Sequence, residues 1–220
     1  RIIFVPETIG AIAYCALNEA GVKKIDTGLV VTTVGGPGQY GYKQSFDCEN
    51  EINKIVEEVF QENGIDFVTY PFDAKGSDER QYSSQGFRMS VTTICKDKYY
   101  EYPYYHTSLD NLEFVKAEEI NRTLSLYLSL VEKLDSNLVY KNVNPNCEVM
   151  LSKHNLYPTT GGALLPVSDA CMTELDIVLW LLFYCDGEKT LFEISKRLKT
   201  SMRSASYVAK KMEEKDILQW

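Results

Sequence analysis

Two histidines are among the side chains in this 220-residue sequence best suited to chemistry. His106 lies in a polar loop, residues 104–111, between an aromatic-rich segment and a long helix. Imidazole is a common metal ligand and a general base, so His106 is a candidate for either role; a surface or hydrogen-bonded structural histidine is the alternative. His154 lies in an irregular stretch far from other candidates, and we interpret it as structural.

Glu7 is the first candidate carboxylate. It follows the apolar run Ile2–Val5, which we interpret as a buried strand, so Glu7 is expected at the carboxyl end of that strand. Reactive groups gather at the carboxyl ends of strands in open α/β sheets, and a carboxylate there can serve as a general base. An acid that complements the dipole of the following helix is an equally good interpretation.

A second polar cluster occupies residues 76–82, GSDERQY. Asp78 or Glu79 could bind a metal or orient a histidine, and Arg80 could hold a substrate carboxylate through two hydrogen bonds. A solvated charged turn is the more frequent reason for such a run. The glycine-rich stretch 35–38 follows a strand, but it lacks the spacing and the lysine of a phosphate-binding loop.

The elements that must position these residues alternate between strand and helix. Apolar and β-branched runs predict strands at 29–34, 66–70 and 89–95, and apolar periodicity predicts helices at 9–20, 49–63 and 117–138. The last helix has its apolar positions at Ile120, Leu124, Leu128, Val131 and Leu134. This alternation predicts an α/β sheet covered on both faces by helices.

The C-terminal part has a different pattern. Residues 141–168 contain prolines and a Gly-Gly pair without periodicity, which predicts a linker. Helices are predicted at 174–184, 190–198 and 201–214, with a capping box at Thr190 and Glu193, and a short strand at 216–220. This is the element order of a winged helix. We therefore assign 1–140 to an α/β domain, 141–168 to a linker and 169–220 to a winged-helix domain.

Composition excludes several classes of protein. The net charge of −8 argues against a broad nucleic-acid-binding surface, and no run of 18 apolar residues could span a membrane. Residues 171–220 contain eight basic and eight acidic side chains, so we expect a packing or oligomer role for the winged helix. Six scattered cysteines without a CxxC pair favour reduced thiols and a cytoplasmic location.

Three segments in this order, RIIFVPETIGAIAY, GSDERQY and YPYYHTSLDNLEFV, resemble a family of bacterial zinc aminopeptidase-like proteins with a C-terminal winged helix. The resemblance covers nearly all of the chain. It implies part of a zinc-exopeptidase-like three-layer α/β sandwich, in which zinc activates water to remove an N-terminal residue from a peptide. It also implies, as does a start without Met inside an apolar run, that the chain is the C-terminal part of a longer protein.

The resemblance also implies roles for individual residues. Glu7 matches the general base and His106 the last zinc ligand, with the other ligands expected upstream of Arg1. Asp110 matches the acid that often follows that histidine. The expected substrate-binding residues are Asp78, Glu79, Arg80 and Tyr105.

Two departures from the pattern limit what the resemblance implies. Related dinuclear enzymes have metal-binding carboxylates where this chain has Thr8 and Thr33, which implies one zinc ion instead of two. We therefore expect a mono-zinc hydrolase of peptides or related amides that requires neither a membrane nor nucleic acid. The alternative is a relative that has lost catalysis and acts as a binding or regulatory protein through its winged helix, and self-association through that helix stays open.

Overall fold

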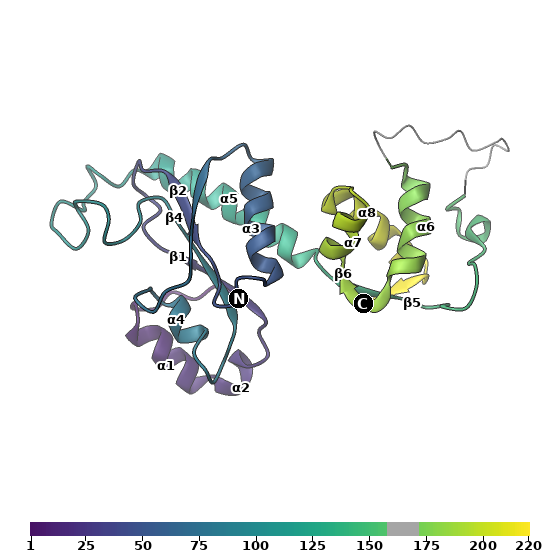
Figure 1. Cartoon of the computed structure of the whole chain (residues 1–220), viewed down its shortest axis with the longest axis horizontal. Coiled ribbons are helices and arrows are strands. Elements are labelled where there is room, and N and C mark those ends of the chain that lie inside the picture. The colour runs from purple at the N-terminus through teal and green to yellow at the C-terminus, as the bar shows by residue number, and fades with distance from the viewer. Residues whose placement is uncertain (158–171) are drawn as a thin grey trace. The chain divides into compact units, whose positions relative to one another are not determined.

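A computed structural model of the chain describes residues 1–157 and 172–220, which form two compact units (Figure 1). We call Arg1–Leu130 the α/β unit and Val131–Trp220 the C-terminal unit. The later part of the predicted linker, and the first three residues of the predicted winged-helix domain, lie outside the described residues. Within the described residues, no helix combines the length and apolar character that crossing a bilayer requires.

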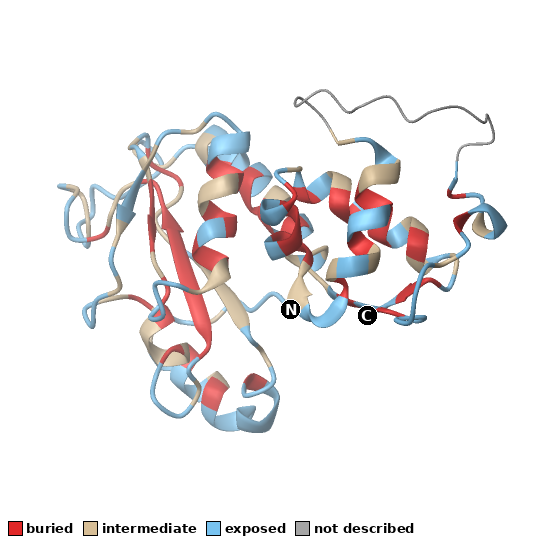
Figure 2. Cartoon of the chain, turned by 45° about the vertical axis from the view of Figure 1, so that its right-hand side comes forward, coloured by how far each residue is buried: buried red, intermediate tan, exposed pale blue. Residues whose placement is uncertain are grey.

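A four-stranded mixed sheet forms the centre of the α/β unit. Its strand order is β1-β4-β2-β3, with β1 at Thr27–Val31, β2 at Tyr40–Lys43, β3 at Phe67–Tyr70 and β4 at Ser90–Cys95. Strand β4 is parallel to β1 and antiparallel to β2, which in turn is parallel to β3. Every residue of β4 is buried, as expected for a strand with neighbours on both sides and helices on both faces (Figure 2).

Helices cover both faces of this sheet, as the sequence predicts. On one face, the Tyr40 ring of β2 contacts Phe60 of α3 (Glu51–Glu62) with ring centroids 5.9 Å apart, and the Tyr40 hydroxyl is hydrogen-bonded to the Thr123 hydroxyl of α5 (Ala117–Asp135) at 3.0 Å (Figure 1). On the other face, Val91 of β4 packs in a cluster with Cys15 of α1 (Ile9–Leu17) and Val22 of α2 (Glu19–Val22). The short helix α4 (Glu79–Tyr82) also contacts β4 on this face.

Helix α3 illustrates why local sequence specifies these elements. The Asn50 side chain caps it by accepting a hydrogen bond from the Ile52 N–H at 3.1 Å. Its apolar residues repeat on one face, and that face is buried. The helix ends before Gly64, whose φ of +63° suits the reversal that follows. The predicted range of 49–63 is therefore confirmed to within two residues.

The apolar run Ile2–Val5 does not form the predicted strand, and this prediction was wrong. Residues 1–6 have no regular structure, and Ile2 and Phe4 are 86% and 95% exposed. A strand needs a neighbour for its backbone N–H and C=O groups, and no described strand pairs with this run. Glu7 therefore follows an exposed segment and does not stand at the end of a strand.

The C-terminal unit joins three helices to a three-stranded antiparallel sheet of order β6-β5-β7. The helices agree closely with the predicted ranges: α6 at Glu174–Tyr184, α7 at Leu191–Arg197 and α8 at Met202–Glu213. The remaining elements are β5 at Val139–Asn142, the 3₁₀ helix η1 at Leu151–His154, β6 at Asp186–Thr190 and β7 at Leu218–Gln219. Only β7 among these strands was predicted, because β5 and β6 are short and polar.

Capping boxes begin two of these helices. Thr173 caps α6 together with Asp176, and Thr190 caps α7 together with Glu193, the pair predicted from the sequence. The helices pack around a hydrophobic cluster that includes Leu181, Ile194 and Met212.

Candidate functional site

The backbone is strained next to the predicted general base. Thr8 has φ +63° and ψ −67°, and the Glu7 C=O accepts a hydrogen bond from the Ile9 N–H at 2.7 Å. Residues 7–9 therefore form a γ-turn with a positive central φ, a rare conformation for a β-branched residue. Such strain costs about 1–3 kcal/mol and persists only where surrounding contacts hold it, which happens most often at functional sites.

The loop before α4 supplies those contacts. Asp78 Oδ1 accepts a hydrogen bond from the Thr8 N–H at 2.7 Å, and the Ser77 hydroxyl donates to Glu7 Oε1 at 2.8 Å. Burial raises the pKa of the Asp78 carboxyl, the charges of Glu7 and Glu79 raise it further, and the Thr8 N–H acts in the opposite direction. The structure thus brings Glu7 and Asp78, distant in sequence, into one site.

Glu79 and Arg80 directly follow Asp78 and begin helix α4. Glu79 is completely buried, and its carboxylate accepts hydrogen bonds from Lys43 Nζ at 3.0 Å, the Ser77 N–H at 3.0 Å and the Thr93 hydroxyl at 3.1 Å. Arg80 is half-buried and donates from Nη1 to the Ala74 C=O at 3.3 Å. Its Nε is buried and has no hydrogen-bond partner among the described residues, so this donor is left unsatisfied.

Tyr105 packs among aromatic rings in the histidine loop. Its ring contacts Tyr100 at 4.9 Å and stacks on His106 at 3.9 Å with an interplanar angle of 18°. Burial raises the pKa of the Tyr105 phenol to about 12, and the charges of Tyr100 and Glu7 contribute. Tyr105 is therefore a neutral hydrogen-bond donor at pH 7, and its hydroxyl lies within electrostatic reach of the Glu7 carboxylate.

His106 and Asp110 have different surroundings. His106 is exposed at a φ of +56°, and its imidazole has no hydrogen bond or ion pair with another described residue. Asp110 is also exposed and accepts a hydrogen bond from the Tyr102 hydroxyl at 2.7 Å. Tyr102 stacks in turn on Phe114, at 5.5 Å and 9°. Asp110 therefore helps to order the aromatic loop, and the His106 imidazole stays free to bind a metal.

The fit of the site to zinc is partial. A catalytic zinc ion needs three protein ligands and one open position. Within residues 1–157 and 172–220, no group of three His, Cys, Asp or Glu side chains is placed to hold a metal ion. His106 suits the role of one ligand, but the described residues do not by themselves form a zinc centre.

Sequence reasoning missed Lys43, Thr93 and the role of Ser77. Lys43 ends strand β2, which has no apolar run to mark it, so nothing in the sequence placed this lysine in the interior. Ser77 stands inside the GSDERQY cluster, and its position directly before Asp78 was the available signal. Thr93 lies in a strand that was predicted, but the sequence did not indicate that its hydroxyl donates a hydrogen bond to Glu79.

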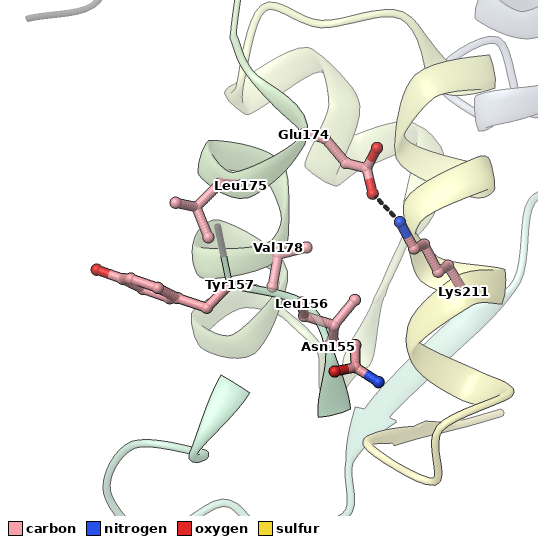
Figure 3. Close-up of a pocket in the computed structure, with 7 residues that line it drawn as sticks. All are labelled: Asn155, Leu156, Tyr157, Glu174, Leu175, Val178 and Lys211. Atoms are coloured by element: carbon pink, nitrogen blue, oxygen red, sulfur yellow. Dashed lines mark hydrogen bonds and ion pairs between the residues drawn. The ribbon is translucent and has the colours of Figure 1, made fainter. Parts of the chain in front are cut away.

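A separate hollow of about 240 Å³ lies in the C-terminal unit. It is lined by Asn155, Leu156, Tyr157, Glu174, Leu175, Val178 and Lys211 (Figure 3). An ion pair between Glu174 of α6 and Lys211 of α8 crosses its edge. None of the predicted site residues lines this hollow, and its two charges neutralise each other.

The layered α/β unit and the appended helix–strand unit together define a peptidase-like fold with a winged helix. The chain belongs to the protein family described as Domain of unknown function (DUF4910), which matches residues 1–137. Residues 138–220 match a winged helix-turn-helix family.

Similar proteins agree with this fold. A Clostridium acetobutylicum protein, provisionally named for polysaccharide biosynthesis with an aminopeptidase-like domain, is 35% identical over 95% of this chain and 47% of its own length. A crystal structure provisionally named a peptidase, also from Clostridium acetobutylicum, has a TM-score of 0.73 and 32% identity, covering 97% of this chain and 46% of its own. The chain thus spans about half the length of the relatives it matches.

A second solved structure is more distant. The zinc aminopeptidase of Bacillus subtilis has a TM-score of 0.48 and 16% identity, covering 57% of this chain and 32% of its own, which is too low to support an inference. The first two similarities and the family matches confirm the predicted fold class and the predicted relation to aminopeptidase-like proteins.

Proposed function

We propose that this chain supplies the general base of an aminopeptidase-like hydrolase, and that Glu7 is that base. The observation that carries the proposal is the strained turn at Thr8, which Asp78 holds while Ser77 holds the Glu7 carboxylate. Strain maintained by two long-range contacts beside an exposed carboxylate is expected where a side chain must be held in position for chemistry. The peptidase-like fold gives this geometry a reaction class, amide hydrolysis.

Glu7 is suited to move a proton. Ser77 occupies its Oε1, whereas Oε2 makes no hydrogen bond with any described residue and can accept a proton from water. Glu7 would take that proton as water attacks the amide carbon, and would then transfer it to the leaving amine. Its exposure allows a peptide substrate to reach it, and the protonated Tyr105 hydroxyl nearby can donate a hydrogen bond to the substrate.

The proposal includes one zinc ion as the cofactor of the complete site. His106 is the described residue that would bind it, and the other ligands would come from outside the described residues. When bound, such an ion polarises a carbonyl group and lowers the pKa of bound water. The proposed substrate is a peptide or related amide with Asp78, Arg80 and Tyr105 near its N-terminal residue, and the proposed location is the cytoplasm.

Replacing Glu7→Gln tests the base directly. The amide keeps the size of the side chain and can still contact Ser77, but it cannot accept the proton. We expect kcat on aminoacyl reporter amides to fall about 10²–10⁴-fold with little change in KM. The measurement uses the complete protein, and its metal content is determined in parallel.

Glu113→Gln is a matched control, because Glu113 is exposed on the same unit and its side chain makes no described contact with the site. Its kcat should equal that of the unmodified protein. Undiminished hydrolysis by Glu7→Gln would reject the base assignment. Absence of both zinc and hydrolysis in the unmodified protein would instead favour the second candidate, a binding or regulatory relative.

A further inference from the structure

A buried ion pair lies directly behind the strained turn. Lys43 and Glu79 are 3% and 0% exposed, and Lys43 Nζ lies 3.0 Å from Glu79 Oε1. The same ammonium group donates to the Asp73 C=O at 3.1 Å and lies 5.3 Å from the centroid of the Phe72 ring. Charged groups are rarely buried so completely unless they are paired and hydrogen-bonded, as these are.

The loop is folded tightly around this pair. A Cβ atom at Gly76 would overlap the Glu79 carboxylate and would lie 2.5 Å from Lys43 Nζ. Glycine is therefore needed at this position for the backbone to approach the ion pair. The Ser77 N–H, one residue further along, donates to Glu79 Oε1 at 3.0 Å, so the carboxylate fixes the backbone of the loop itself.

The same loop also contacts Glu7 and the turn at Thr8. Ser77 binds Glu79 through its N–H and Glu7 through its hydroxyl, and Asp78, between Ser77 and Glu79 in sequence, holds the Thr8 N–H. On its other side, the Glu79 carboxylate is anchored to the central strand by the Thr93 hydroxyl. A continuous set of contacts thus runs from the middle of the sheet to the strained turn.

We propose that the buried Lys43–Glu79 ion pair is a positioning device that sets the location of the Glu7 carboxylate, an inference that rests on the proposed role of Glu7 as general base. Neither residue of the pair contacts the substrate; both act through Ser77 and Asp78. A buried ion pair is a poor way to gain stability, because desolvation of its charges opposes their attraction. It is an effective way to fix a loop, because its hydrogen bonds allow few alternative arrangements.

The variant Glu79→Gln tests the device. It keeps the shape of the side chain but weakens the contacts with Lys43 and Ser77. We expect a folded protein in which kcat falls roughly a hundredfold, the effect of a small misplacement of a catalytic group, while KM stays within about twofold. We also expect faster hydrogen exchange at the Thr8 amide, because the bond to Asp78 is no longer held.

Glu119→Gln is the matched control. Glu119 pairs with another buried lysine, Lys96, in the same unit, but no described contact links that pair to Glu7. Its loss should lower stability without changing kcat or Thr8 exchange. If Glu79→Gln does not fold, the double variant Lys43→Met with Glu79→Gln, which buries no unpaired charge, provides the same two measurements.

The two readouts separate this inference from the proposed function. Folded pair variants with unchanged kcat and unchanged Thr8 exchange would overturn the positioning role, even if Glu7→Gln is inactive. Hydrogen exchange at the Thr8 amide can be measured without turnover. Faster exchange in the pair variants would therefore show that the Lys43–Glu79 pair holds the turn at Thr8, even if Glu7→Gln proved fully active and the base assignment failed. If Glu119→Gln unexpectedly lowered kcat as much as Glu79→Gln does, the inference would also be overturned.

Discussion

The two units of this molecule bury different kinds of side chain. The α/β unit places the charged groups of Lys43, Glu79 and Lys96 in its interior. The core of the C-terminal unit is a mainly aliphatic cluster, in which Leu181 and Ile194 are completely buried, although Lys133 of this unit is buried as well. Buried charges are costly to desolvate and depend on directional contacts, whereas aliphatic packing is stabilising and non-directional.

This difference indicates where position matters more than stability. In the α/β unit, buried charges, a strained turn and an exposed carboxylate are joined by hydrogen bonds of 2.7–3.1 Å. In the C-terminal unit, capped helices close around an apolar core whose packing does not depend on directional contacts. The comparison supports the proposal that the chemistry belongs to the first unit, and it agrees with the expected packing or oligomer role of the second.

The largest expected effect on stability concerns the aliphatic core. Leu181→Ala removes a completely buried side chain from α6 and should lower the free energy of unfolding of the C-terminal unit by about 2–5 kcal/mol. Leu179→Ala, on the more exposed side of the same helix, is the control and should cost less than about 1 kcal/mol. Denaturant titration measures both, and equal losses would contradict the assignment of the core.

A smaller effect, which depends on pH, is expected at the Lys96–Glu119 pair. The hydrogen bond from Lys96 holds the pKa of Glu119 below its ordinary value of 4.5. The pair therefore stabilises the fold above that pH, and the contribution is lost as pH falls through the lower folded-state pKa. Glu119→Gln should cost about 1–3 kcal/mol at pH 7, because Lys96 stays buried with a neutral partner.

Unfolding measured from pH 7 to pH 3 checks this prediction. The difference in stability between the unmodified protein and Glu119→Gln should shrink over the acid range. A difference that stays constant with pH would show that the charge of Glu119 plays no part, and would weaken the contrast between the two interiors.

The smallest expected effect concerns a helix cap. Thr190→Ala removes the oxygen that accepts the Glu193 N–H at 3.1 Å and should destabilise the C-terminal unit by about 1 kcal/mol. Thr190→Ser retains the hydroxyl and should cost only a few tenths of that amount. Thermal unfolding followed by circular dichroism is the measurement, and equal effects of the two variants would show that the hydroxyl does not cap α7.

Much of the fold could be predicted because its signals are local. Helices α3, α6, α7 and α8 are encoded by periodicity and caps within a few residues of each end. Periodicity did not identify the buried face of α5, since its residues Ile120, Leu124, Leu128 and Val131 are exposed. Strands β2, β5 and β6 were missed, because their stability comes from partners distant in sequence.

The residues of the candidate site likewise separate into those that local sequence identifies and those that depend on tertiary contacts. Glu7 and Asp78 were identified from motifs, and the structure joins them through the hydrogen bonds at Thr8 and Ser77. Lys43 could not be found, because what makes it notable is its burial against Glu79, a property of tertiary structure. The Ile2–Val5 run shows the opposite error, in which apolar composition alone was interpreted as burial.

The sheet of the C-terminal unit joins strands that are far apart in the sequence. Strand β5 pairs with β7, so that Asn142 lies opposite Leu218. During translation β5 leaves the ribosome long before its partner has been made, and one of its edges stays open until residues 217–219 emerge. Closure of this sheet is therefore expected after the whole unit has been synthesised, and a ribosome stalled before Ile217 should display a protease-sensitive nascent chain.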